Sequence, residues 1–435
     1  MDISRKEILP GVALTCLRSD KFKTACLSLS LLSQLRRETA SMNALIPFVL
    51  RRGTTLYPDM EAISRRLDEL YGTAIEPVVR RVGEIQCTGF YASIPEGDFL
   101  PGGQDILRDA AGLMGQILLS PATRGGLLLP DYVDSEREKL CELIRSRVND
   151  KRGYAMMRCM EEMCCYENYA VGRYGSESDC EGIHYQKLTR HYRSLLQTAP
   201  IELFYCGRAD SRRVEEAVTD ALAALPRGEI DLDIGTDVRM NAVEAEPRYV
   251  EEAMSVTQGK LVIGFRLGDA MEEPDPAALT VFNSVFGSGS TSKLFVNVRE
   301  RLQLCYYASS GIDMHKGLMV VSSGIEFDKF DEAKSEIFAQ LDEIKDGNIT
   351  DDELSAAKAG IASALRSSMD SQGELEGFYL SQTLAGLDYG PMELAELVED
   401  VTKEDVAAIA RGVECDLIYF LKGNGEEGDD GGDDE

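Results

Sequence analysis

The distribution of apolar and polar residues along the chain predicts strands and helices in an order that occurs twice. Strands are expected where apolar residues alternate with polar ones, and helices where apolar residues recur every three or four positions. In the first half, these patterns predict strands at 12–17, 24–32, 74–82, 84–93 and 201–206, and helices at 38–50, 59–70, 106–119, 132–148, 154–165, 185–196 and 212–225.

The second half repeats this order. Its patterns predict strands at 249–256, 260–266, 306–312, 318–325 and 417–421, and helices at 276–286, at 292–302 and, three or four in number, across 328–412. The closing strands of the two halves, IELFYCGRA and CDLIYFLKG, occupy equivalent places. We therefore predict an α+β fold of two tandem units, each an antiparallel-rich sheet packed with helices.

Composition gives the expected domain boundaries. The chain has 435 residues, enough for two hydrophobic cores. A polar stretch rich in Gly and Asp makes the best linker, so we expect a first domain at 1–225, a linker at 226–248 and a second domain at 249–423. The remaining segment, 424–435, is acidic and rich in Gly, and we expect it to be disordered.

Charge and cysteine content exclude several classes of function. The chain has 75 acidic and 46 basic residues, a net charge of −29, which disfavours nucleic acid as a partner. It has no apolar run long enough to cross a membrane, and its first residues lack the apolar core of a signal peptide. Eleven cysteines without a C-x-x-C motif indicate reduced thiols and a cytoplasmic protein.

The stretch FNSVFGSGSTSKLFVNVRERLQLCYY, at 282–307, holds the strongest candidate site. It predicts a helix end, a Gly/Ser turn, a second helix capped by Thr291 or Ser290, and the start of a strand. The second helix has an apolar stripe: Leu294, Phe295, Val298 and Leu302. The Gly/Ser turn lacks the Gly-Lys-Ser/Thr sequence of a phosphate-binding loop, so a turn between helices is preferred. Arg299 lies in the last helical turn and Tyr306 just beyond it.

This stretch resembles the second half of the pitrilysin-type (insulinase, M16) metallopeptidases, in which a helix with Arg precedes a strand that begins Gly-Leu-Ala-Tyr. Arg299 and Tyr306 match the Arg/Tyr pair of that family, whereas the family's Gly is Gln303 here. The resemblance implies a LuxS/M16-type fold and a role for both residues in binding a peptide substrate. Without it, Arg299 would be read as a solvated helix residue and Tyr306 as a half-buried strand residue.

The zinc site of the family is degenerate in this sequence. Its His-x-x-Glu-His motif aligns, through the anchor Arg51–Thr54, with Ala44, Pro47 and Phe48, none of which can bind a metal. The family's third ligand, a Glu on a later helix, aligns with Leu143. A shift of one residue would place Glu142 there, so its role stays open. We refer to Ala44, Pro47, Phe48 and Leu143 as the metal positions. The resemblance therefore implies no metal and no other cofactor.

A second metal site is conceivable at Cys180, His184 and His191. The two His are seven residues apart on a predicted helix and so lie on a similar face. No second ligand pair has metal-binding spacing, and we favour ordinary helix and loop roles for all three.

Two functions fit a chain that has the Arg/Tyr pair and lacks the zinc ligands. Half-size members of the family form two-chain peptidases, so the chain could be the non-catalytic, peptide-binding subunit that assembles with a homologous zinc-bearing subunit. It could instead be a structural scaffold. The segments 43–47 and 51–57 also resemble the zinc-less YmfF-type group of Gram-positive bacteria. That group is associated with modification of elongation factor P.

Overall fold

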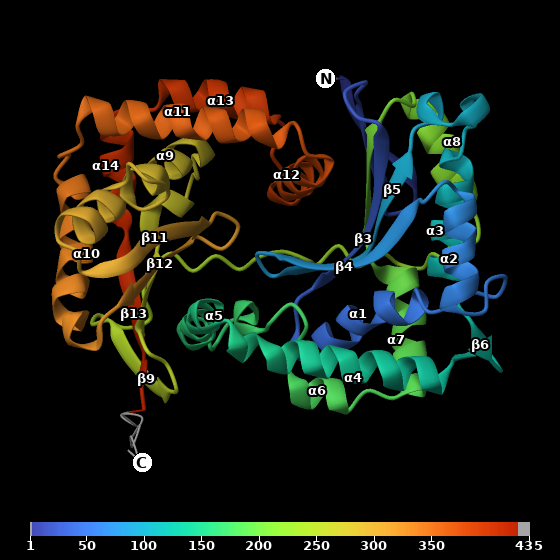
Figure 1. Ribbon diagram of the computed structural model, residues 1–435, viewed down its shortest axis with the longest axis horizontal. Coiled ribbons are helices and arrows are strands. Elements are labelled where there is room, and N and C mark those ends of the chain that lie inside the picture. Colours follow the sequence, from blue (N-terminus) through green and yellow to red (C-terminus); the bar gives the residue numbers. More distant parts are fainter. Residues whose placement is uncertain (1, 425–435) are drawn as a thin grey trace, which may run out of the picture. The chain divides into compact units, whose positions relative to one another are not determined.

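The computed structural model describes residues 2–424, which form two compact units (Figure 1). The first unit contains the chain up to Arg145, Val171–Thr236 and Ser368–Tyr389; the second contains Ser146–Ala170, Asp237–Ser367 and the chain from Gly390 onward. These units differ from the contiguous ranges 1–225 and 249–423, because each includes a helical segment from the other half of the sequence. A change in composition can mark a linker, but it cannot show that a helix packs on a distant sheet. The predicted disordered tail lies outside the described residues from 425 onward.

The first unit is built on a six-stranded sheet in the order β1-β2-β8-β3-β5-β4. Only β2 and β8 pair in parallel. The strands are β1 (Asp2–Leu9), β2 (Val12–Arg18), β3 (Thr24–Gln34), β4 (Ala74–Val82), β5 (Ile85–Pro95) and β8 (Ile201–Gly207). The sequence pattern did not predict β1, since this edge strand is mostly polar and exposed and so has no apolar face to show.

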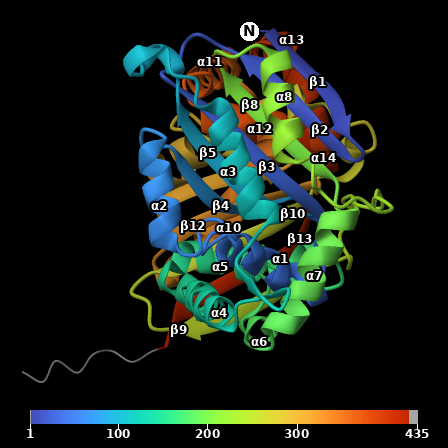
Figure 2. The same cartoon turned by 90° about the vertical axis from the view of Figure 1, so that its right-hand side faces the viewer.

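One face of this sheet carries the main core of the unit, formed with its own helices. Figure 2 shows α3 and α8 side by side over the sheet, where Gly115 allows close contact because a Cβ there would collide with the carbonyl of Ala221. The helices are α1 (Arg37–Leu50), α2 (Met60–Glu69), α3 (Leu107–Leu119), α4 (Pro130–Ser146), α6 (Glu177–Glu181), α7 (Tyr185–Thr198) and α8 (Ser211–Ala221), with a short hairpin of β6 (Thr123–Arg124) and β7 (Leu127–Leu128).

The second unit has a five-stranded sheet in the order β11-β12-β10-β13-β9, in which only β13 and β9 are parallel. Its strands are β9 (Arg248–Met254), β10 (Gly259–Arg266), β11 (Cys305–Asp313), β12 (Leu318–Ile325) and β13 (Glu414–Gly423). Its helices are α5 (Lys151–Met163), α9 (Pro276–Phe286), a π-helix (Leu294–Arg301), α10 (Phe330–Lys345), α11 (Asp351–Ser368), α13 (Pro391–Asp400) and α14 (Lys403–Gly412). With α12 (Gln372–Ala385), the described chain has five α-helices after Asp328, rather than three or four.

The two sheets have the same topology. The order β2-β8-β3-β5-β4 of the first sheet corresponds to β9-β13-β10-β12-β11 of the second, and the parallel pair occupies the same place in both. The closing strands β8 and β13 are therefore equivalent, as their sequences predicted, and β1 is an addition to the first sheet. The equivalence also makes β4 and β11 corresponding edge strands.

In the first unit, α12 covers the second face of the sheet, and a buried carboxylate holds it there. Leu375 packs into a cluster of buried residues on this face. Glu376 is 1% exposed, pairs with the guanidinium of Arg80 and accepts a hydrogen bond from the Ser28 hydroxyl at 3.0 Å. The amide nitrogen of Gln372 donates to backbone carbonyls of β3 and β8 at 2.8 and 2.7 Å. An ion pair and hydrogen bonds thus hold α12, a helix from the second half of the sequence, on the sheet of the first unit.

In the second unit, α5 packs on the sheet in the same manner, and the segment that follows it carries a buried carboxylate. Glu167 accepts from Arg266 and from Lys316, each at 2.7 Å. Arg266 also donates to Asp416 at 2.9 Å, and Asp416 accepts from Arg248 at 2.8 Å. The side chains of Arg266, Lys316 and Asp416 are fully buried. Three cations and two carboxylates therefore form a buried ionic network that ties the segment 146–170 to this sheet.

Candidate functional site

The helix that carries Arg299 is a π-helix rather than the predicted α-helix. Its N–H groups bond to carbonyls five residues back, for example from Leu302 to Asn297 at 3.1 Å. The π-helix ends at Arg301, so Leu302, the last residue of the predicted apolar stripe, lies beyond its last turn. Leu294 and Val298 are fully buried, whereas Leu302 is 42% exposed. The last residue of the predicted stripe is therefore on the surface.

The predicted cap of this helix also differs. Neither Thr291 nor Ser290 caps it; the hydroxyl of Ser292 accepts from the backbone N–H of Phe295 at 3.3 Å. Ser292 is fully buried, so its hydroxyl satisfies a backbone donor inside the unit.

Gln303, which replaces the family's Gly, has a backbone φ of +52°. Only one other non-glycine residue among those described has a positive φ: Tyr71, at +56°, just before β4. Because β4 and β11 are equivalent edge strands, both units use a left-handed residue at the same place. A side chain there is strained, which explains why Gly suits this position.

Tyr306 lies at a bulge at the start of β11. The register passes from Cys305 opposite Ile325 to Tyr307 opposite Gly324, so that Tyr306 is the unpaired residue. Its side chain is 60% exposed, and its hydroxyl donates to the carboxylate of Glu326. That hydrogen bond and the negative charge of Glu326 raise the pKa of Tyr306. The bulge thus directs the phenol to the surface.

Arg299 has partners of its own. Its guanidinium lies 4.7 Å from the centroid of the Phe295 ring, and its Nε is 3.7 Å from a carboxylate oxygen of Glu300. The π-helix that carries Arg299 packs against β11, the strand that begins at Cys305. No hydrogen bond joins Arg299 to Tyr306 within residues 2–424, so the pair shares a neighbourhood without direct contact.

The metal positions hold no zinc ligand. On α1, Ala44 and Pro47 are buried and Phe48 is partly buried, all within the apolar core of the first unit. On α4, Leu143 is 41% exposed and Glu142 is exposed beside it. The described residues contain no cluster of three His, Cys, Asp or Glu side chains that could hold an ion.

Cys180, His184 and His191 take part in separate hydrogen bonds. The Cys180 thiol contacts the carbonyl of Arg137 at 3.6 Å, and the Nδ1 of His184 caps α7 by accepting from the backbone of Lys187 at 3.3 Å. Nε2 of His191 lies 2.6 Å from the side-chain oxygen of Asn43. The structure therefore does not bring these three residues together as one site.

A buried polar network lies beside the metal positions, and no motif in the sequence predicted it. The amide nitrogen of Asn43 donates to Ser33 and to Gln86, both at 2.9 Å. The amide nitrogen of Gln86 donates to the carbonyls of Ala40 and Arg173 at 2.9 and 2.7 Å. Since the oxygen of Asn43 can only accept, Nε2 of His191 carries the proton. Both amides are fully satisfied, which makes this region a structural core.

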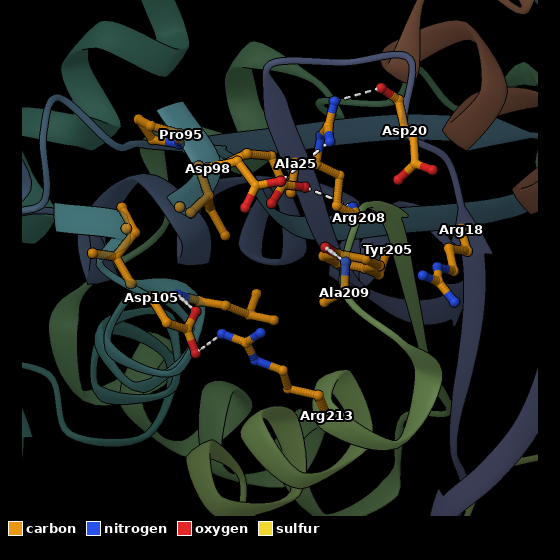
Figure 3. Close-up of a pocket in the computed structure, with 16 residues that line it drawn as sticks. Arg18, Asp20, Ala25, Pro95, Asp98, Asp105, Tyr205, Arg208, Ala209 and Arg213 are labelled. Atoms are coloured by element: carbon orange, nitrogen blue, oxygen red, sulfur yellow. Dashed lines mark hydrogen bonds and ion pairs between the residues drawn. The ribbon is translucent and has the colours of Figure 1, made fainter. Parts of the chain in front are cut away.

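The first unit also contains a charged cavity of about 260 Å³ at the end of β8 (Figure 3). Arg208 donates to Asp98 at 3.2 Å and to the carbonyl of Asp20 at 2.7 Å, and Arg213 pairs with Asp105. Figure 3 shows these pairs within the lining itself. Two of the three arginines that line the cavity are neutralised by the chain's own carboxylates, so the cavity is not favoured as the functional site.

Three comparisons with known proteins agree with the fold. A family model described as Peptidase M16 inactive domain matches residues 182–361. The Probable inactive metalloprotease YmfF of Bacillus subtilis (strain 168) is 33% identical over 414 residues, which cover 95% of this chain and 96% of that protein. Among the helices of residues 2–424, none has the length and apolar composition needed to cross a bilayer.

Two solved structures share the fold over almost the whole chain. A conserved protein from Enterococcus faecalis V583 has a TM-score of 0.87 at 24% identity, covering 97% of this chain and 99% of that one. A peptidase M16 inactive domain from Pseudomonas fluorescens has a TM-score of 0.76 at 16% identity, covering 97% and 98%. The likeness to the Bacillus protein, at 33% identity over almost the whole of both chains, shows that this chain belongs to the M16 peptidase family, as one of its inactive homologues.

Proposed function

We propose that this chain is the substrate-binding, non-catalytic subunit of a two-chain M16-type zinc peptidase, whose zinc is carried by a homologous partner. One observation carries the proposal: Arg299 and Tyr306 stand at the start of an unpaired sheet edge, while the metal positions are filled by apolar side chains. A chain with this combination can hold a peptide, but it has no group to activate water. Such a subunit would work in the cytoplasm, to judge from its eleven cysteines.

The edge strand β11 supports peptide binding by strand addition. It pairs with β12 on one side and with no other strand of the five-stranded sheet. The N–H of Ser310 on this strand already donates to the carbonyl of Gly287 at 3.1 Å, so an extended peptide would use the remaining N–H and C=O groups of the edge. Its alternate side chains then face the same side of the sheet. Within the hairpin of β11 and β12, only β11 lies at the edge of the sheet, so β11 is the proposed binding strand.

Arg299 and Tyr306 would bind oxygen atoms of this peptide. A guanidinium offers several donors and keeps its charge, so Arg299 is suited to hold a carbonyl. The phenol of Tyr306 can donate to an oxygen that gains negative charge during hydrolysis. Tyr306 donates to Glu326 in the present structure, so peptide binding requires that hydroxyl to exchange one acceptor for another.

A scaffold function without peptidase chemistry is the alternative, and one observation favours it. Both Arg299 and Tyr306 already have partners within the chain, as a purely structural pair would. Support of elongation factor P modification would belong to this alternative, although no described residue points to that pathway.

Hydrolysis of a quenched fluorescent peptide library by the purified chain, alone and mixed with a zinc-bearing homologue from the same organism, tests the proposal. We expect hydrolysis only in the mixture, and its loss when the chain carries Arg299→Ala. Arg301→Ala is the matched control, since Arg301 lies on the same helix, is well exposed and reaches Glu336 only at 3.8 Å. A stable complex in which Arg299→Ala has no effect on hydrolysis would support the scaffold alternative instead.

A further inference from the structure

Two cations meet over one aromatic ring in the second unit. The guanidinium of Arg152, in the first turn of α5, lies 4.2 Å from the centroid of the Tyr307 ring. The ammonium of Lys260, on β10, lies 5.9 Å from the same centroid. Tyr307 belongs to the edge strand β11, next to Tyr306. Three segments that are distant in the sequence thus place two positive charges beside the proposed peptide-binding edge.

Neither cation has a carboxylate partner among residues 2–424. Arg152 donates to the hydroxyl of Ser309 at 2.8 Å, and Lys260 donates to the amide oxygen of Gln258 at 2.5 Å. Asp150, close in sequence, caps α5 by accepting from the N–H of Gly153 at 3.0 Å. Burial, followed by the positive charge of Arg152, lowers the pKa of Lys260. In a chain with 75 acidic and 46 basic residues, two neighbouring cations without a counter-charge are not explained by a shortage of carboxylates.

Packing fixes the position of the Tyr307 ring that both cations contact. A Cβ at Gly324, on the neighbouring strand β12, would lie 2.5 Å from the Cε1 atom of Tyr307 and 2.8 Å from the side-chain oxygen of Gln258. The ring therefore packs directly on the backbone of Gly324, beside the side chain of Gln258. Because Arg152 and Lys260 are held by the ring, by Ser309 and by Gln258, their donors are arranged before any ligand binds.

We propose that Arg152 and Lys260 form a subsite for a carboxylate of the peptide that pairs with β11. This inference rests on the proposed function. Arg152 contacts both Tyr307 and Ser309, which are two residues apart and so lie on one face of β11. Every second side chain of a peptide added to this edge faces the same way. A carboxylate there can accept from the unused N–H groups of both cations, in charge-assisted hydrogen bonds.

The carboxylate can come from an acidic side chain or from the C-terminus of the peptide, since both offer the same pair of oxygens. The test therefore uses three pools of random peptides made from the same neutral residues. The first contains Glu and has amidated C-termini, the second contains Gln in place of Glu, and the third contains Gln and has free C-termini. The full-length chain is immobilised, and captured peptides are measured by mass spectrometry.

We expect capture of one carboxylate-containing pool to exceed that of the amidated Gln pool by roughly tenfold, the strength of a charge-assisted hydrogen bond. Arg152→Gln and Lys260→Gln should each reduce this ratio to about one. Lys334→Gln should retain it, because Lys334 is likewise placed over an aromatic ring, at 4.9 Å from the centroid of Phe330, but pairs with Asp331 at 3.0 Å.

The outcomes separate this inference from the proposed function. Equal capture of all three pools would contradict the carboxylate subsite and leave peptide binding intact. No capture of any pool would contradict the proposed function, and the subsite with it. Preference for the Glu pool identifies an acidic side chain as the ligand, and preference for the third pool identifies the C-terminus. A ratio unchanged by both Arg152→Gln and Lys260→Gln would place the carboxylate site elsewhere.

Discussion

The carboxylate of Glu167 lies 2.7 Å from the guanidinium of Arg266, and both side chains are withdrawn from solvent. Arg266 also neutralises Asp416, so its removal would leave two buried carboxylates with fewer donors. Breaking such a buried pair costs about 3–5 kcal/mol, because no water replaces the lost donor and each carboxylate keeps a single cation, Lys316 for Glu167 and Arg248 for Asp416. We therefore predict that Arg266→Met lowers the free energy of unfolding by about this amount. Urea unfolding measures the change, and hydrogen exchange should show α5 among the loosened elements.

Arg212→Met provides the control for this prediction. Arg212 pairs with Glu216 at 3.0 Å on α8, and its side chain is 87% exposed. Exposed ion pairs contribute little, so the change should stay within about 0.5 kcal/mol. If Arg266→Met unfolds at the same urea concentration as the wild type, the buried ionic network does not hold the segment 146–170 on the second sheet.

The same carboxylate predicts a pH dependence. Burial by itself would raise the pKa of Glu167, but hydrogen bonds from Arg266 and Lys316 hold it below its ordinary value. The unfolded chain, with a Glu pKa of about 4.3, then takes up the proton more readily than the folded chain. The stability from Glu167 is present above that pH and is lost as pH falls through the lower, folded value.

Unfolding free energies measured across this acid range should fall less steeply for Glu167→Gln than for the wild type. Glu216→Gln, on the exposed face of α8, should follow the wild-type curve. Parallel curves for Glu167→Gln and the wild type would mean that Glu167 titrates alike in both states.

Most helices and strands could be predicted from the sequence. It could not be predicted that each unit includes a helical segment from the other half of the chain. Apolar residues in short runs or in alternation predicted the strands β2, β3 and β10–β12, because the pattern of buried residues in each strand is visible in its own sequence. The partners of Glu167 lie far away in the sequence, and nothing near Glu167 shows that it is buried. Similarly, the spacing of Leu294, Val298 and Leu302 fits one continuous helix, and only the backbone shows that the helix ends at Arg301 and leaves Leu302 exposed beyond it.

The candidate site was partly predictable. Arg299 and Tyr306 follow from a motif, and Glu326 could have been placed from the hairpin, because it follows the strand that pairs with the start of β11. Arg152 and Lys260 could not, since their meeting over Tyr307 depends on a helix from the other half of the sequence. Arg152 lies in the first half of the sequence but packs in the second unit, so this part of the site could not be predicted from the sequence.

Gln303→Gly should stabilise the chain. A left-handed non-glycine residue costs roughly 1–2 kcal/mol of strain, which glycine removes. Glycine also makes the unfolded chain more flexible, and this entropy offsets part of the gain in stability. We expect a net increase of about 0.5–1 kcal/mol in the free energy of unfolding. Thermal and urea unfolding check it. Leu302→Gly, at a neighbouring residue with a φ of −94°, should destabilise instead. If Gln303→Gly is less stable than the wild type, contacts of the glutamine side chain contribute more to stability than its left-handed backbone costs.

His191→Ala should destabilise the first unit by about 1–3 kcal/mol, because the oxygen of buried Asn43 loses its donor. Burial, and then the charge of Lys187, lowers the pKa of His191. The folded chain thus binds a proton less readily than the unfolded chain, whose His pKa is about 6.5, and His191 removes stability as pH falls below that value. Urea unfolding above and below this pH should show a smaller pH effect in His191→Ala. Arg190→Ala, at an exposed position of the same helix, should behave as the wild type.

Glu326→Gln should lower the pKa of Tyr306 toward the ordinary tyrosine value of about 10. In the wild type, the hydrogen bond to the carboxylate of Glu326 stabilises the protonated phenol, and the negative charge of that carboxylate opposes formation of the phenolate, so the pKa of Tyr306 is raised. Glutamine can still accept the hydrogen bond but carries no charge, and the electrostatic part of the shift disappears. Ultraviolet titration of each protein against its Tyr306→Phe counterpart isolates this one phenol among 17 tyrosines. Glu300→Gln removes a charge beside Arg299 and should leave the titration unchanged. An identical midpoint in wild type and Glu326→Gln would mean that Tyr306 does not donate to Glu326 in solution, and that its hydroxyl is already free to meet a peptide.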